Sequence, residues 1–133
     1  MNFVCGMLLL LLEEEDAYWV MVTILGELVP HYYNGNLIGN MADQRTLEQL
    51  LKQHLPACYE ALQSNGVTME LFATQWLLSL YVNALPTETV LRVWDVFFYD
   101  GREALMRIAL AMFLQAQDDI VKSTNSMEVL RAI

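Results

Sequence analysis

One stretch of the chain, residues 85–101, constrains the fold most, because its pattern predicts a short helix that other helices must bury. Its sequence is LPTETVLRVWDVFFYDG. Pro86 fixes φ in the range of a first helical turn, and Thr87 is a candidate N-cap. A wide apolar stripe then recurs at helical spacing, formed by Val90, Val93, Trp94, Phe97 and Phe98. Gly101 tolerates the left-handed conformation that ends helices. We expect neighbours on more than one side of this helix.

The same helical periodicity runs through most of the chain, and no stretch sustains the period of two that strands show. Helices are predicted over residues 2–12, 13–29, 40–55, 56–64, 69–81, 85–101 and 102–117, with the acidic cluster at residues 13–16 in the first turn of the second. A last helix ends at Ile133 and begins with an Asn125/Glu128 capping box, while Thr68 is the predicted cap of the helix over 69–81. The predicted fold is all-α: a multi-helix orthogonal bundle in one domain.

The spacing of apolar residues also predicts which faces are buried. In the helix over residues 13–29 the buried face comprises Tyr18, Met21, Val22, Leu25, Leu28 and Val29. In the helix over residues 40–55 it comprises Leu47, Leu50, Leu51 and Leu55. The helix over residues 2–12 is apolar nearly all round, so we expect it in the core.

Residues 30–40 (PHYYNGNLIGN) are the least helical stretch. Asn34-Gly35 could turn a hairpin, but only three apolar-rich residues flank it on each side. An ordered loop is the preferred interpretation, with Tyr32 and Tyr33 pinning it to the helices. A functional surface loop is the open alternative.

The chain is more apolar than a free-standing soluble domain usually is. Hydrophobic residues make up 56% of its 133 residues, where roughly 45–50% is typical. The helix over residues 2–12 begins in the middle of its apolar pattern. We therefore expect the fold to be incomplete at the N-terminal side, with a covering segment outside this sequence.

The leucine run at residues 8–12 is not read as a targeting or membrane segment. No basic residue precedes it, and four acidic residues, 13–16, follow where a signal-peptide cleavage site would lie. The run is also too short to cross a bilayer, which takes about 20 residues. Direct membrane insertion is therefore not expected.

Charge excludes some partners. The net charge is −9, which argues against binding nucleic acid or an anionic membrane surface, because both require clustered Lys and Arg. Cys5 and Cys58 stand far apart without paired spacing. Reduced, buried thiols of a cytosolic protein are the preferred interpretation, and a disulfide is the alternative.

A search for a self-contained active site predicts no catalytic, cofactor-binding or metal-binding residue. His31 and His54 have no partner at metal-ligand spacing, and no phosphate-binding or nucleophile motif occurs. The carboxylates at 13–16 are read as a solvated helix start rather than a cation site. Three tryptophans, Trp19, Trp76 and Trp94, are read as core rather than as the lining of a ligand pocket.

Arg92 is read as half of an internal ion pair with Asp95, three residues on, rather than as an arginine finger. On this reading Arg92→Ala and Trp94→Ala each cost on the order of 3 kcal/mol of stability or more.

Several short motifs together resemble a known family. They are Met1-Asn2-Phe3, Glu14-Glu15-Asp16-Ala17-Tyr18-Trp19, Tyr32-Tyr33, Asp43-Gln44, Leu55-Pro56, Trp76-Leu77-Leu78, Leu85-Pro86 and the run from Arg92 to Gly101. Their order and spacing are similar to the TBC (Tre-2/Bub2/Cdc16) domain from Met1 to about Gln117. The resemblance implies an all-α activator of Rab-type small GTPases in vesicle trafficking. It also implies a cytoplasmic protein, peripheral to endomembranes through its partner.

The resemblance also implies a two-finger mechanism. In the family an Arg from an Ile-x-x-Asp-x-x-Arg motif stabilises charge on the γ-phosphate, and a Gln from a Tyr-x-Gln motif orients the attacking water. Neither motif occurs in these 133 residues. By the family pattern the Gln would lie just before Met1 and the Arg further upstream. No catalytic residue is therefore carried over, and residues 1–133 are predicted to be the C-terminal portion of a TBC domain.

Three functions stay open at this point. The chain is part of a Rab activator that is inactive alone, with the N-terminal half of the domain as a further partner. Alternatively, it is a non-catalytic module that binds a small GTPase or another protein. The third alternative is an unrelated helical bundle that binds a small apolar ligand.

Overall fold

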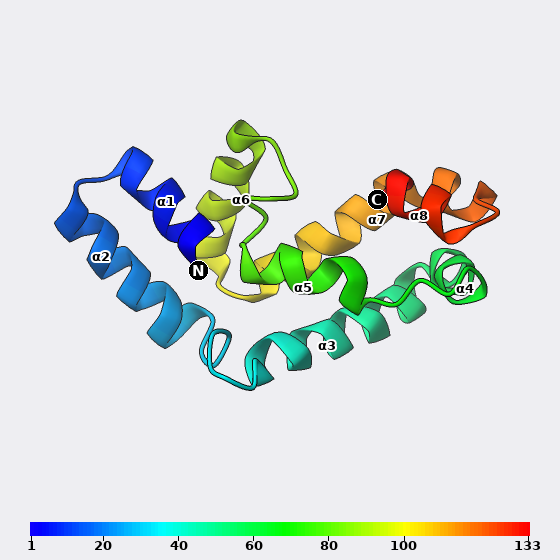
Figure 1. Ribbon diagram of the computed structural model, residues 1–133, viewed down its shortest axis with the longest axis horizontal. Coiled ribbons are helices and arrows are strands. Elements are labelled where there is room, and N and C mark those ends of the chain that lie inside the picture. Colours follow the sequence, from blue (N-terminus) through cyan, green and yellow to red (C-terminus); the bar gives the residue numbers. More distant parts are fainter.

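Helices build the whole fold, and no strand is present in the computed structural model, which describes residues 1–133 (Figure 1). In chain order the elements are α1 (Asn2–Leu11), α2 (Glu14–Thr23), a π-helical turn η1 (Ile24–Leu28), α3 (Ile38–His54), α4 (Pro56–Ser64), α5 (Glu70–Leu78), α6 (Thr87–Asp100), α7 (Glu103–Lys122) and α8 (Ser126–Ala132). The all-α prediction is confirmed. None of these helices has both the length and the hydropathy that crossing a bilayer requires.

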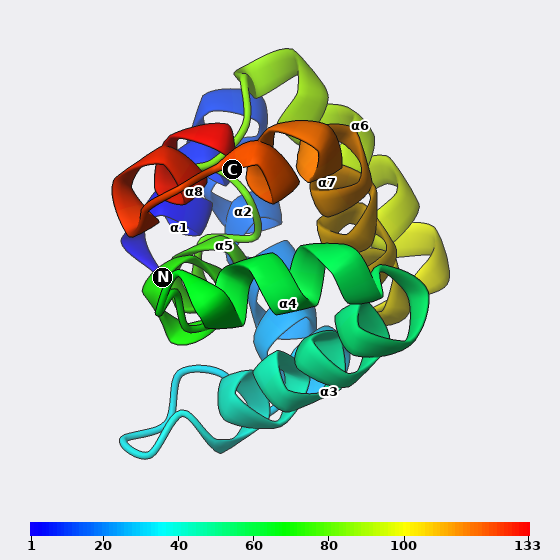
Figure 2. The same ribbon diagram turned by 90° about the vertical axis from the view of Figure 1, so that its right-hand side faces the viewer.

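The long helix α7 connects the two ends of the molecule. It packs against α6 at one end and against α4 and α8 at the other, and α3 also contacts it. Figure 1 shows α1, α2 and α6 gathered on the left and α4 and α8 on the right. Figure 2 looks from the α4–α8 end, with α1 and α2 behind. The buried apolar residues of all the helices form one continuous core.

Helix α6 is buried on one face only, which corrects the sequence prediction. Val90, Val93, Trp94 and Phe97 lie in the core. Phe98 is 43% exposed and Tyr99 is 91% exposed, because α6 packs mainly on α7 and its opposite side faces solvent. Thr87 is the first helical residue and not the cap, since Pro86 occupies the N-cap position.

The predicted faces of the first two helices are only partly right, because Val29 is fully buried and Met21 and Leu28 pack partly buried against the core. In α1 only Val4, Met7 and Leu8 are buried, so this helix is not surrounded by the core. In α2 and η1 the buried residues are Ala17 and Ile24, whereas Tyr18 is exposed. A bond from the backbone N–H of Val29 to the Ile24 carbonyl (2.8 Å) closes a π turn. This turn follows Tyr18 and Val22, which are exposed, so the packing of α2 and not the turn decides which of its faces meets the core.

The loop between η1 and α3 is ordered, as predicted, and forms no hairpin strands. Tyr32 is fully buried, and Tyr33 donates from its hydroxyl to the Leu78 carbonyl at 2.6 Å. Helix α3 begins at Ile38, two residues earlier than predicted. Gly39 sits where a Cβ would lie 2.5 Å from the Pro30 carbonyl oxygen, so only glycine lets the loop fold back onto the helix.

Most of the residues that were predicted to begin or end a helix do so. Gly66 ends α4 with φ +66°. The Asn125 side chain accepts from the Glu128 backbone N–H at 3.0 Å, which begins α8. Thr68 does not cap α5, which starts at Glu70 without a side-chain cap. Helix α7 continues to Lys122, five residues beyond its predicted end.

Candidate functional site

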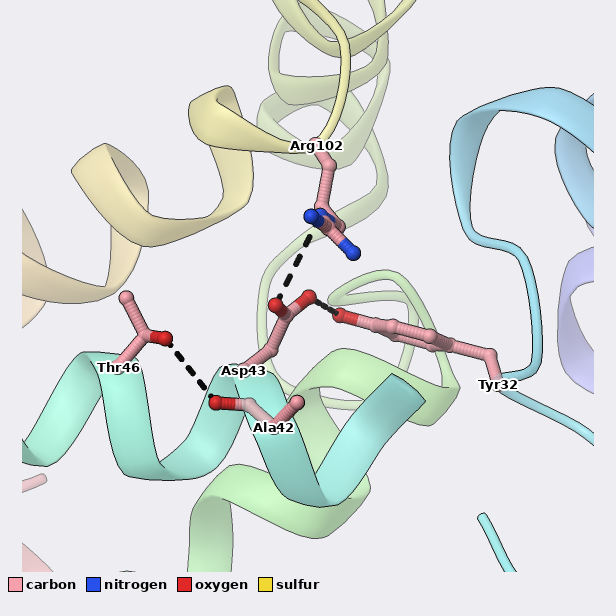
Figure 3. Close-up of polar contacts among 5 residues, drawn as sticks. All are labelled: Tyr32, Ala42, Asp43, Thr46 and Arg102. Atoms are coloured by element: carbon pink, nitrogen blue, oxygen red, sulfur yellow. Dashed lines mark hydrogen bonds and ion pairs between the residues drawn. The ribbon is translucent and has the colours of Figure 1, made fainter. Parts of the chain in front are cut away.

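A buried polar cluster joins the η1–α3 loop to the first turns of α3 and to the corner between α6 and α7 (Figure 3). The Tyr32 hydroxyl donates to the Asp43 carboxylate. Arg102 approaches the other carboxylate oxygen with its Nε at 3.7 Å. The Asp43 side chain is only 8% exposed, so the Tyr32 hydroxyl and the Arg102 charge replace the water it loses.

The electrostatics of this cluster suit a structural tie and not acid–base chemistry. Burial, followed by the hydrogen bond to Asp43, raises the pKa of Tyr32 far above its usual value. The phenol therefore stays protonated and keeps donating. A group of this kind neither attacks a substrate nor exchanges protons near neutral pH.

A second polar chain links α3 to α5. The Gln44 side-chain amide donates to the Asn40 side-chain oxygen and to the Thr74 hydroxyl at 3.0 Å. Asn40 is fully buried, and its side-chain nitrogen has no partner in the protein. These contacts hold the start of α3 against α5, so Asp43 and Gln44, adjacent in the sequence, anchor α3 in two directions.

The irregular segment between α5 and α6 is held by hydrogen bonds from aromatic side chains. Leu80 and Tyr81 have positive φ values of 46° and 66°, conformations that cost energy for residues with a Cβ. The Tyr81 hydroxyl donates to the Leu105 carbonyl at 2.6 Å, and the Trp94 indole donates to the Leu80 carbonyl at 3.0 Å. Burial raises the pKa of Tyr81 above its usual value, which keeps this donor protonated.

Arg92 and Asp95 do not form the predicted internal pair. Both side chains are exposed on the outer face of α6, and no hydrogen bond or ion pair joins them. The two ion pairs of the molecule are Arg102–Asp43 and Arg107–Asp100. Val93 and Trp94, which lie between Arg92 and Asp95 in the sequence, point into the core. One motif therefore carries both buried and exposed residues.

The other residues singled out in the sequence lie apart from one another. His31 and His54 are both exposed, and no three His, Cys, Asp or Glu side chains come together as a metal site would need. Cys58 is buried as expected, but Cys5 is exposed, and both thiols are free. Burial raises the pKa of the Cys58 thiol to about 11.

The three tryptophans line no common pocket. Trp76 and Trp94 are buried, while Trp19 is exposed on α2. Two of the larger hollows on the surface are open grooves. One of about 630 Å³ lies at the α1–α2 corner and one of about 420 Å³ lies between the end of α3 and α7.

Comparison with known proteins assigns the chain to a family. A family model described as "Rab-GTPase-TBC domain" matches residues 1–121. The chain belongs to this family. The resemblance drawn from the short motifs is therefore confirmed over nearly the whole chain.

Curated relatives and a solved structure agree with this assignment. Growth hormone-regulated TBC protein 1 of Xenopus tropicalis is 35% identical over 130 residues, which are 97% of this chain and 38% of that protein. Human small G protein signaling modulator 3 is 34% identical over 133 residues, which are 99% of this chain and 18% of that protein. The TBC chain thus spans well under half the length of these relatives.

The crystal structure of the Chlamydomonas flagellar RabGAP TBC domain superposes with a TM-score of 0.85 at 30% identity. The alignment covers 99% of this chain and 44% of that one. Four residues of the motifs in this TBC chain, Tyr32, Asp43, Gln44 and Trp94, form the polar ties described above.

Arg102 and Thr74 complete these ties, and no sequence pattern indicated either residue. Their partners Asp43 and Gln44 lie far away along the chain, so no local spacing could indicate the contacts.

Proposed function

We propose that this chain acts in GTP hydrolysis by a Rab-type small GTPase, as the C-terminal portion of a TBC domain whose two catalytic fingers lie outside residues 1–133. The observation that carries the proposal is the family match over residues 1–121, combined with the lack of both finger motifs in the sequence. On this proposal the chain regulates an enzyme and holds no catalytic residue or cofactor of its own.

The physics of the reaction explains why the chain alone should be inactive. Phosphoryl transfer is accelerated by charge stabilisation and by positioning of the attacking water. An arginine that the activator supplies raises the rate of hydrolysis roughly a thousandfold or more. Arg92 is exposed, but the resemblance assigns it to the scaffold motif and not to the finger motif. The chain therefore supplies scaffold and partner surface, without the groups that stabilise the transition state.

The expected partners follow from the same proposal. A Rab-type GTPase recruits the protein to endomembranes from the cytoplasm, where it serves vesicle trafficking. Nucleic acid is not a partner, because the net charge is −9 and a phosphate backbone would be repelled.

Single-turnover GTP hydrolysis across a panel of Rab GTPases tests this function. We expect the 133-residue chain to leave the rate unchanged. A longer form carrying both motifs should accelerate it by about a thousandfold or more for at least one Rab. In that form, replacing either finger residue by Ala should abolish the gain. Stimulation by the 133-residue chain would disprove its inactivity alone, and a longer form that stimulates no Rab would refute the function.

A non-catalytic binding module is the second candidate, favoured by the single continuous core of 30 buried residues. It predicts that the chain alone unfolds cooperatively and is retained by a GTP-loaded Rab without changing hydrolysis. Calorimetric melting and binding to immobilised Rab measure both points. A non-cooperative melt or no retention by any Rab would eliminate this candidate.

A further inference from the structure

A small pocket opens between the middle of α3 and the start of α5, two helices that pack against each other (Figure 1). Its lining residues are Met41, Gln44, Arg45, Glu48, Met69 and Glu70. Its volume is about 90 Å³, which holds a few water molecules or the head group of one side chain, but not a helix. None of Tyr32, Asp43 and Arg102 lines it, so it is separate from the cluster that ties the loop to α3.

Gln44 offers this pocket a hydrogen-bond acceptor that the protein leaves unused. Gln44 is only 8% exposed, and its Nε2 donates to Asn40 and to Thr74. Its Oε1 accepts no hydrogen bond within the chain. This oxygen is not sealed from solvent either, since the Asn40 nitrogen is the one fully enclosed side-chain atom without a partner. A mostly buried acceptor that is left open in this way points to a donor from outside the chain.

The rim of the pocket adds two carboxylates. Glu48 and Glu70 take part in no ion pair. Glu48 accepts one hydrogen bond, from the Tyr59 hydroxyl at 3.3 Å, which leaves its second oxygen free. Arg45 also lines the pocket but pairs with neither carboxylate. Two carboxylates and one guanidinium give the lining a net charge of −1, so the pocket favours a cation over an anion.

These groups suit a guanidinium better than an ammonium. A guanidinium presents five N–H donors in one plane and no acceptor, whereas an ammonium is a compact, strongly hydrated point charge. The Gln44 oxygen and the two carboxylates can each accept one or more of those donors. Met41 and Met69 supply flexible apolar walls, against which the alkyl stem of an arginine can lie.

We propose that the pocket between α3 and α5 binds an arginine side chain that a partner protein presents. The guanidinium would donate to the Gln44 Oε1 and to the carboxylates of Glu48 and Glu70. The pocket would then be one anchor point within a larger contact. This inference goes beyond the proposed function and stands or falls separately from it, because it involves neither the finger residues nor GTP hydrolysis.

Titration of a capped arginine into the ¹⁵N-labelled chain tests the proposal. The probes are N-acetyl-arginine N-methylamide, its neutral citrulline isostere and its lysine analogue, all at equal ionic strength. We expect the arginine probe to shift the Gln44 side-chain amide signals saturably. The citrulline probe keeps the shape but loses the charge, so it should bind about tenfold more weakly or worse, and the lysine probe should also bind more weakly. Equal binding by either analogue, or no saturable shift with arginine up to about 100 mM, would overturn the proposal.

Neutralising the rim provides a variant with a matched control. Glu48→Gln combined with Glu70→Gln should weaken binding of the arginine probe about tenfold, as expected for losing two surface ion pairs. Glu60→Gln combined with Glu88→Gln removes the same charge at exposed positions on α4 and α6 and should leave the affinity within about twofold. Equal weakening in both pairs would indicate general electrostatic attraction and contradict the site. Dispersed amide signals in the same spectra show that each variant is folded.

Arg45 gives a test with the opposite sign. Arg45→Gln removes a like charge from the lining, so it should strengthen binding of the arginine probe about twofold or more. Weaker binding in this variant would mean that the probe does not enter the pocket as a cation, which would refute the proposal.

Two further measurements separate a partner protein from other sources of the arginine. Free L-arginine should bind no more tightly than the capped probe, and tighter binding would replace the partner by the free amino acid. Arg92 is exposed and unpaired, so a second copy could supply the same group. Sedimentation should show a monomer. A dimer that Glu48→Gln combined with Glu70→Gln dissociates would replace the partner by a second copy of this chain.

Discussion

Arg92 and Trp94 are two residues apart on α6, yet they contribute differently. The Trp94 ring is buried, and its indole nitrogen donates to the Leu80 carbonyl at 3.0 Å. Arg92 is exposed and makes no hydrogen bond or ion pair. Burial with a satisfied donor stabilises a fold, whereas an unpaired surface charge contributes little.

We predict that Trp94→Ala lowers the free energy of unfolding by about 3–5 kcal/mol, because it empties a core site and leaves the Leu80 carbonyl without its donor. Arg92→Ala should change that free energy by less than about 0.5 kcal/mol, in contrast to the cost expected from the sequence. Urea denaturation followed by circular dichroism measures both. Equal losses in the two variants would show that Arg92 is paired after all.

At the scale of elements, the start of α3 depends on one close backbone approach. A Cβ on Gly39 would lie 2.5 Å from the Pro30 carbonyl oxygen and 3.0 Å from the Tyr32 ring. The loop must therefore move away if any side chain is added. The Tyr32–Asp43 hydrogen bond, which joins this loop to α3, would be strained by that movement.

Gly39→Ala is expected to destabilise the protein by about 2 kcal/mol or more, because backbone atoms cannot yield as a flexible side chain can. Gly6→Ala is the matched control, since Gly6 is also helical and nothing lies within 4 Å of its added Cβ. This control should stabilise by about 0.5–1 kcal/mol through helix propensity. Melting temperatures of the two variants test this prediction. A Gly39→Ala variant as stable as the wild type would contradict the close approach of Gly39 to the Pro30 carbonyl oxygen.

At the scale of the whole molecule, buried proton donors tie stability to pH. Burial raises the pKa of the Cys58 thiol from about 9 to about 11 and the pKa of the Tyr33 phenol to about 12. The unfolded chain therefore releases these protons at lower pH than the folded chain does. Their contribution is complete below pH 9 and is lost as the pH rises toward the folded values.

Thermal melting between pH 8 and 11 should show a progressive fall in stability, on the order of 2 kcal/mol from Cys58 alone by the upper limit. Cys58→Ala should flatten this slope even if it lowers stability at pH 8. Cys5→Ala, at an exposed cysteine, should leave the slope unchanged. Parallel slopes for the wild type and Cys58→Ala would rule out the coupling.

The sequence by itself determined the helical fold and most helix boundaries, because these depend on signals a few residues long. Pro56 begins α4, Gly66 ends it, and Asn125 with Glu128 begins α8. The family could also be recognised from the sequence, since its motifs are short segments in a fixed order. The proposal that residues 1–133 hold no finger residue likewise rests on local motifs.

Only the tertiary structure decided which faces are buried and which polar residues meet. The core covers Ala17 and not Tyr18 of α2, and the single-sided packing of α6 exposed Tyr99. Arg102 reached Asp43 from a distant corner. Burial and ion pairing depend on what packs against a residue, and neighbours distant in sequence leave no local signal. The helix over residues 85–101 was predicted from its own pattern, but its solvent face was visible only in the fold.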